Sequence, residues 1–140
     1  MRRFSRSLLA AAALLAGIST AQAEKAFVRE ALGSDAVRLE GTLAKRPARP
    51  GDPAQLKKEA EAAFAAKNFQ ALEETTGRLV VLAPRDWTAW LRLSIAYSGL
   101  QPADWQAKYN ARRDAHASAY QAYRLAPGPR EEATALTQLA

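Results

Sequence analysis

His116 is the only histidine of the chain, and it lies two residues after Asp114 in a polar stretch. An imidazole beside a carboxylate is a pairing that general acid–base catalysis uses, so an enzymatic interpretation would start here. A catalytic site also needs partners that converge from other parts of the chain, and no nucleophile motif or phosphate-binding loop supplies them. A single histidine on an alanine-rich helix is more typical of a surface or packing position. We therefore expect no catalytic residue and no enzyme.

Two pairs of glutamates, Glu59 with Glu61 and Glu73 with Glu74, also stand close together in the sequence. Neighbouring positions of a helix point in different directions, so neither pair forms an acid–base dyad. A zinc site needs several imidazole, thiolate or carboxylate ligands at workable spacing, and the chain has no cysteine. We expect neither a metal nor a cofactor.

The aromatic residues carry a stronger indication than the titratable ones. Trp105 precedes Tyr109 by four residues in a polar segment. Trp105 could cover the end of a helix pair, or it could anchor a partner, because exposed Trp and Tyr are common binding hot spots. We expect Trp90, by contrast, to lie in the core.

The first 23 residues have the pattern of a secretory signal peptide. Arg2, Arg3 and Arg6 precede an apolar stretch over residues 8–18, and Ala21-Gln22-Ala23 matches a cleavage site. The apolar stretch is shorter than the roughly 20 residues that span a bilayer, so we expect no membrane insertion after cleavage. The pattern predicts a periplasmic or secreted protein.

Cleavage would leave residues 24–140 and would lower the net charge. The leader holds three of the 20 basic residues and none of the 14 acidic ones, so the net charge of +6 falls to +3. This modest charge argues against nucleic acid as a partner. An exported chain without cysteine has no disulfides, so helix packing or a larger partner must stabilise it.

The sequence after the leader predicts an all-α fold. Residues 24–44 form a helical segment, in which Gly33-Ser34 either kinks the helix or begins a second one. A proline-rich linker over 45–53 is expected to be extended. Helices are then expected over 54–66 and 69–82, within a repeat region that extends over 54–140.

Capping and helix-breaking residues predict where the remaining helices begin and end. Asp86 is a suitable N-cap for a helix over 87–98, and Gly99 suits its end. Pro102 is expected in the first turn of the next helix, which ends near Leu125. Pro127-Gly128-Pro129 breaks the chain before a last helix over 131–140.

The pattern of these helices resembles tetratricopeptide repeats. The first-helix pattern W-x2-L-small-x2-Y is met by Trp90, Leu93, Ser94 and Tyr97. Second-helix positions are matched by Ala115, Ala122 and Pro127, and one repeat earlier by Phe69, Leu79, Leu82 and Pro84. The resemblance implies antiparallel helix pairs stacked as a short α-solenoid, an architecture that commonly binds other proteins or peptides.

In repeats of this kind the first helix of each pair lines a groove. The resemblance places Lys57 and Glu61 there in the first pair, and Thr88, Leu91 and Ile95 in the second. Together with Trp105 they are the residues that we expect to contact a partner. The alternative is a helix face that packs against a further domain.

The mature N-terminus resembles a second family, the bacterial alpha-2-macroglobulin-like proteins. Residues 25–30, KAFVRE, and residues 34–40, SDAVRLE, are similar to the start of those proteins, where a degenerate helical repeat region follows the leader. The resemblance implies a piece of a protease inhibitor whose remaining domains lie elsewhere. The thioester cysteine of that family is absent here, so protease trapping is not assigned to these residues.

Three functional hypotheses follow. The leading one is a non-catalytic interaction module from the N-terminal region of an alpha-2-macroglobulin-like protein, truncated within its repeat region. The alternative is a free-standing periplasmic scaffold that binds a peptide or an envelope complex. The third is an enzyme, and it depends on a site around His116 and Asp114.

Overall fold

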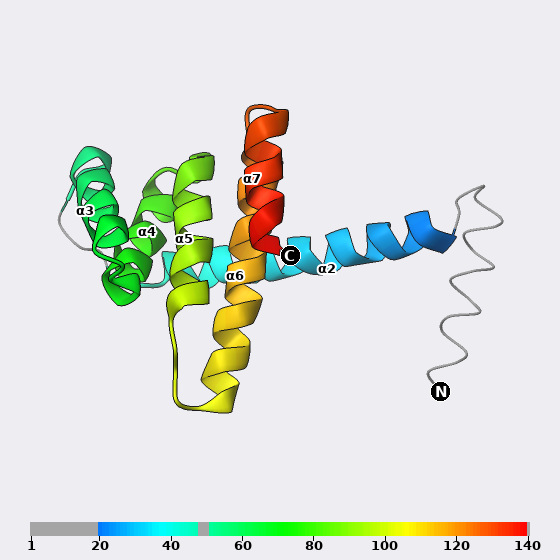
Figure 1. Cartoon of the computed structure of the whole chain (residues 1–140), viewed down its shortest axis with the longest axis horizontal. Helices are drawn as coiled ribbons and strands as arrows, with labels where there is room; N and C mark the ends of the chain where they lie inside the picture. The colour runs from blue at the N-terminus through cyan, green and yellow to red at the C-terminus, as the bar shows by residue number, and fades with distance from the viewer. Residues whose placement is uncertain (1–19, 48–50, 140) are drawn as a thin grey trace. The chain divides into compact units, whose positions relative to one another are not determined.

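The computed structural model describes residues 20–47 and 51–139, with side chains from residue 29 onward. Every regular element in this part of the chain is an α-helix, as the sequence predicts (Figure 1). The helices are α2 (Thr20–Ala44), α3 (Pro53–Ala65), α4 (Phe69–Leu82), α5 (Trp87–Gly99), α6 (Trp105–Leu125) and α7 (Pro129–Leu139).

The chain divides into two compact units between Leu32 and Gly33, within α2. Of the first unit the structure describes only the helical segment over 20–32, and most of the predicted leader lies outside the described residues. A second helix beginning at Gly33-Ser34, one of the two alternatives considered, is wrong, because α2 is a single helix through both residues. A glycine inside a helix costs only about 1 kcal/mol relative to alanine, which packing further along the helix can offset.

Short polar side chains fix where the other helices begin. Asp52 Oδ1 accepts a hydrogen bond from the Gln55 backbone N–H at 2.8 Å, so α3 starts one residue earlier than expected, at Pro53. Asp86 caps α5 through the N–H groups of Thr88 and Ala89, which confirms the sequence prediction.

The start of α6 differs from the expectation. Pro102 does not lie in its first turn, because the helix begins at Trp105. The cap is Asp104, whose Oδ2 accepts a hydrogen bond from the Ala107 N–H at 3.0 Å. A carboxylate that satisfies a free backbone donor is a stronger start signal than a proline two residues before it.

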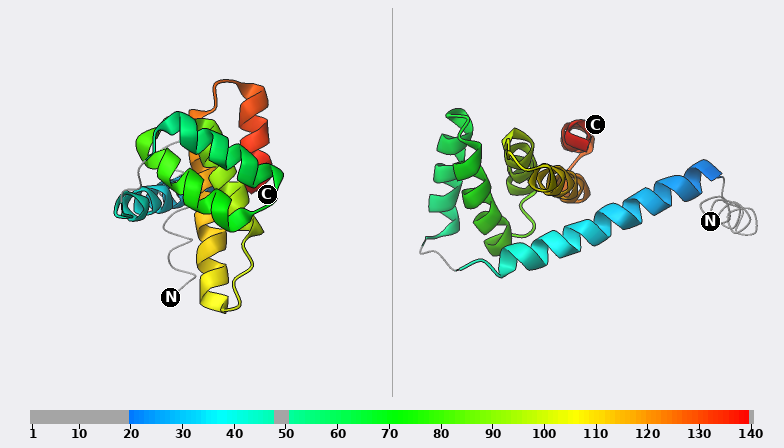
Figure 2. Two further views of the ribbon diagram at one scale, coloured as in Figure 1. Left: turned by 90° about the vertical axis from the view of Figure 1, so that its left-hand side faces the viewer. Right: turned by 90° about the horizontal axis from the view of Figure 1, so that it is seen from below.

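In the second unit each helix from α3 to α7 packs against the next one along the chain (Figures 1 and 2). Trp90 is fully buried in the main core, as predicted, and its indole N–H donates to the Pro84 carbonyl at 2.9 Å. A smaller cluster between α3, α4 and α5 contains Ala60, Leu72 and Ala96.

Gly99 ends α5 by a different mechanism from the one expected. Its backbone does not adopt the left-handed conformation of a glycine cap, since Gly51 is the only glycine with positive φ among the described residues. A Cβ at Gly99 would instead clash with the ring of Phe69, the first residue of α4. Glycine is needed here for close approach of two helices.

The second half of α2 belongs to the same unit as α3–α7. Its apolar side is buried there, with Ala36, Leu39 and Leu43 each no more than 2% exposed. Polar contacts accompany this burial: Arg113 donates to Asp35 at 2.8 Å, Arg38 donates to Asp114 at 2.6 Å, and Arg46 pairs with Glu73. Within the described ranges, no helix has the length and apolar character needed to cross a bilayer.

Candidate functional site

The structure brings three of the predicted partner-binding residues to one groove between α3 and α5. Lys57, Glu61 and Thr88 all line it, together with Asp86 and Arg92. Capping by Asp86 and the packing of α4 against both helices set the positions of these side chains. The three residues therefore share a surface, although they come from two different helices.

The charges of this groove are paired across it. Lys57 Nζ lies 3.2 Å from an Asp86 carboxylate oxygen, and Glu61 lies 3.5 Å from Arg92 Nε. Arg92 also stacks over the Phe64 ring, 3.5 Å from its centroid. A ligand at this groove would have to compete with these contacts.

The two apolar residues predicted for the groove lie deeper. Leu91 is 8% exposed and belongs to the main core, and Ile95 is partly buried against that core. Neither presents the open apolar face that a peptide groove would need. A charged substitution at Leu91 would disturb the core itself, so it is a poor probe of binding.

Trp105, the sixth predicted residue, lies apart from this groove at the start of α6. Its side chain is 73% exposed, and that of Tyr109, one turn later, is 57% exposed. A tryptophan with this exposure does not seal the end of a helix pair. This exposure contradicts the covering role, and the role of Trp105 as a partner anchor stays a prediction.

His116 and Asp114 face different surroundings. Two residues on a helix are separated by about 200°. Asp114 accepts a hydrogen bond from Arg38 of α2, whereas His116 lines a cleft on another side of α6. The pairing on which an enzymatic interpretation would depend is therefore absent from this region of the fold.

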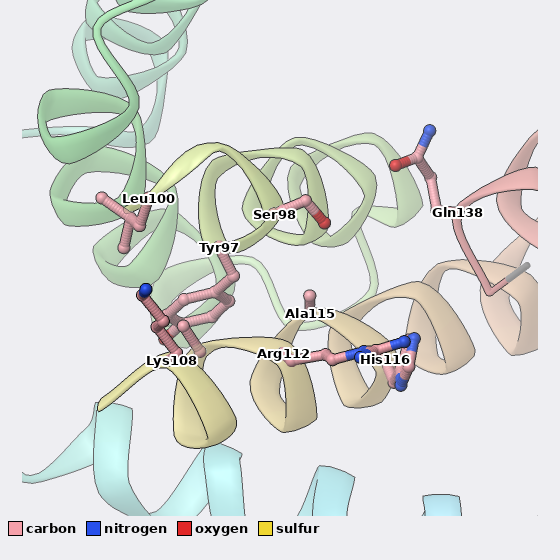
Figure 3. A pocket seen from close by; sticks show the side chains of 9 residues that line it. Tyr97, Ser98, Leu100, Lys108, Arg112, Ala115, His116 and Gln138 are labelled. Atoms are coloured by element: carbon pink, nitrogen blue, oxygen red, sulfur yellow. The ribbon is translucent and has the colours of Figure 1, made fainter. Parts of the chain in front are cut away.

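The cleft beside His116 has a volume of about 370 Å³ and lies between α5, α6 and the end of α7 (Figure 3). The basic residues Lys108, Arg112 and His116 are spaced by four, so they form one stripe along α6. We call this feature the α6 cleft. It is lined by Tyr97, Ser98, Leu100, Lys108, Ala111, Arg112, Ala115, His116 and Gln138.

Tyr97 joins the α6 cleft to the interior. It is only 7% exposed, and burial is the main cause that raises the pKa of its phenol. The negative charges of Glu73 and Asp114 raise it further, while Arg46 opposes them. Tyr97 is therefore a neutral wall of the cleft at any physiological pH.

In the described part of the chain, no three or more side chains of His, Cys, Asp or Glu gather in a way that could hold a metal ion. Comparison with known proteins gives no match: no family model, no curated protein and no solved structure resembles the chain significantly.

Sequence reasoning missed Lys108 and Arg112. Their signal is present in the sequence, as a four-residue spacing that continues to His116 within the segment that holds Trp105. The sequence neighbours of His116, Arg113 and Asp114, are engaged with α2 on another side of the helix. The four-residue spacing, which puts Lys108, Arg112 and His116 on one side of α6, is the signal that predicts the stripe.

Proposed function

We propose that this chain is an exported, non-catalytic protein-interaction module whose helices form tetratricopeptide-like pairs. The packing of the signature residues supports the repeat interpretation. Trp90, Leu93 and Ser94 are fully buried, and the Ser94 hydroxyl donates to the Ala115 carbonyl at 2.9 Å. Small residues at this contact let α5 and α6 approach closely, which is the role that the repeat pattern gives them.

The observation that carries the interaction function is the exposure of Trp105. The fold buries Trp90 completely, yet it leaves Trp105 73% exposed with exposed Tyr109 beside it. Aromatic side chains contribute most to binding when a partner removes them from water. An exposed aromatic pair at the start of α6, a helix whose second half is buried, is thus suited to anchor another protein.

Site-specific photo-crosslinking in cells tests this function. A photoreactive phenylalanine analogue replaces Trp105 in one variant and Val37 in a matched control, because Val37 is similarly exposed, at 70%, but stands alone on α2. We expect a discrete crosslinked protein from position 105 and none from position 37. Equal crosslinking at both positions, or none at 105, would refute the proposed anchor.

We further propose that the module acts in the periplasm as the N-terminal region of an alpha-2-macroglobulin-like protease inhibitor. The leader pattern and the KAFVRE and SDAVRLE segments support this proposal. Protease inhibition would then require the other domains of that protein. The alternative is a free-standing periplasmic scaffold, which would need no further domain.

The mass of the native product separates these two proposals. An antibody against residues 24–44 is used to probe cell-envelope fractions by immunoblotting. A band several times heavier than the 140-residue precursor supports the inhibitor interpretation. A band slightly lighter than the precursor supports the free-standing scaffold, and a product confined to the cytoplasm contradicts both.

A further inference from the structure

We propose that the α6 cleft binds an acidic segment of a partner protein, with Lys108 and Arg112 as carboxylate ligands and Trp105 and Tyr109 as apolar anchors. This inference rests on the proposed interaction function, and it specifies the chemistry of the partner. It concerns a different surface from the α3–α5 groove, whose charges are already paired.

The aromatic and basic residues lie along one side of α6. At about 100° per residue, Trp105, Tyr109, Arg112 and His116 fall within an arc of roughly 60°, and Lys108 extends it to roughly 100°. Figure 3 shows Lys108, Arg112 and His116 along α6, with Gln138 of α7 across the cleft. An aromatic end therefore leads directly into a basic cleft.

The cations of the α6 cleft have no ion-pair partner among the residues that line it. No acidic residue lines it, and neither Lys108 nor Arg112 has an ion-pair partner among residues 29–47 and 51–139. Of the nearby acids, Asp104 accepts the capping hydrogen bond of the Ala107 N–H just before α6, and Asp114 of α6 pairs with Arg38. Two permanent positive charges in a concave surface attract a negatively charged ligand.

A comparison of Arg112 with its neighbour Arg113 supports the assignment of Arg112 as a carboxylate ligand. Arg113 follows Arg112 directly, but its guanidinium is held by Asp35 of α2, with donor–acceptor distances of 2.8 and 2.5 Å. The fold thus neutralises one arginine and leaves the adjacent one open to the cleft. If the basic residues of α6 served only to keep the surface soluble, there would be no reason for Arg113 to be paired while Arg112 is not.

The dimensions favour a narrow chain over a flat surface. From Lys108 to His116 the helix rises about 12 Å, which equals three to four residues of extended peptide. Arginine can bind a carboxylate through two parallel hydrogen bonds, and neutral Ser98 and Gln138 can serve the peptide backbone. A short acidic stretch beside an apolar or aromatic residue would match both the basic cleft and the exposed pair.

Fluorescence anisotropy with the full chain tests the proposal. The probe is a fluorescein-labelled hexapeptide of alternating glutamate and leucine, and the same peptide with glutamine in place of glutamate is its neutral counterpart. We expect the acidic peptide alone to bind, with an affinity that decreases as salt is added. Equal binding of both peptides, or of neither, would overturn the proposal.

Matched variants locate the binding. Lys108→Gln and Arg112→Gln should each weaken the acidic peptide by up to about fivefold, the range of exposed charge pairs. Lys58→Gln and Arg85→Gln remove equally exposed cations outside the cleft and should leave the affinity unchanged. Circular dichroism checks that every variant is folded. If the control variants weaken binding as much as the cleft variants, the proposed site is wrong.

A measurement without substitutions provides an independent check. In the NMR spectrum of the ¹⁵N-labelled protein, the indole signal of Trp105 should shift on adding the acidic peptide, whereas that of buried Trp90 should not. Anionic phospholipid vesicles and a single-stranded oligonucleotide are tested in the same way. A response to either of these, but not to the peptide, overturns the assignment of an acidic protein segment.

These outcomes remain distinct from those of the crosslinking experiment. Crosslinking at position 105 together with failure of the acidic peptide would leave the interaction function intact and refute the partner chemistry. If crosslinking fails but the acidic peptide still binds in a way that depends on Arg112, the aromatic anchor is refuted. The basic cleft would then remain the proposed binding site.

Discussion

Leu39→Ala tests whether the second half of α2 is an integral part of the fold. Leu39 is 1% exposed, between buried Ala36 and Leu43. Truncating a buried leucine to alanine typically costs about 2–5 kcal/mol, which includes the cavity that remains. A domain of this size has roughly 5–15 kcal/mol of stability in total, so the loss is a large fraction of it. At roughly 4 °C per kcal/mol, we expect the Tm to fall by about 8–20 °C.

Val37→Ala is the matched control for this prediction. Val37 lies two residues away on the same helix but is 70% exposed, so its truncation should change stability by no more than about 0.5 kcal/mol. Both variants are measured by thermal and urea unfolding, followed by circular dichroism. If Leu39→Ala unfolds at the same temperature and urea concentration as Val37→Ala, α2 does not dock as described.

Two further predictions concern close packing and pH. Gly99→Ala should destabilise the fold by about 1–3 kcal/mol in urea unfolding, because its Cβ would clash with Phe69. Gly41→Ala, which meets nothing within 4 Å, should instead stabilise α2 by up to about 1 kcal/mol, and equal effects of the two substitutions would contradict this account. The raised pKa of Tyr97 means that the folded state favours the neutral phenol. Its contribution to stability is therefore present below the unfolded tyrosine pKa of about 10 and is lost as pH rises above it. Tyr97→Phe should reduce the loss of stability between about pH 8 and pH 11, and an unchanged profile would contradict the assignment.

Local signals predicted the helices well where one residue decides the boundary. Asp86 caps α5 and Trp90 enters the core, because each role depends on residues only a few positions away. The helix through Gly33-Ser34 could not be predicted in this way. Its continuity is consistent with burial of Leu39 and Leu43 against distant helices, which offsets the local cost of glycine.

Contacts between distant residues were also what the sequence could not predict at the candidate site. Of the five groove residues that the repeat positions predict, Lys57, Glu61 and Thr88 share one surface, and those positions carried no information about the partners of the two charges. Those partners, Asp86 and Arg92, depend on how α3 approaches α5, and pairing makes the groove less available to a ligand. Sequence patterns identify a shared face more readily than they identify which charges on it remain unpaired.

The length of α6 explains why the α6 cleft exists at all. With 21 residues it extends about 31 Å, whereas α5 has 13 residues and extends about 20 Å. The additional length carries the start of α6 beyond the end of α5. There α2 engages Arg113 and Asp114 on one side, while Trp105, Tyr109 and Arg112 remain open on another. A longer helix without a binding role would be expected to expose mainly polar residues. This one exposes two aromatic rings beside unpaired cations, which is the composition expected of a binding surface.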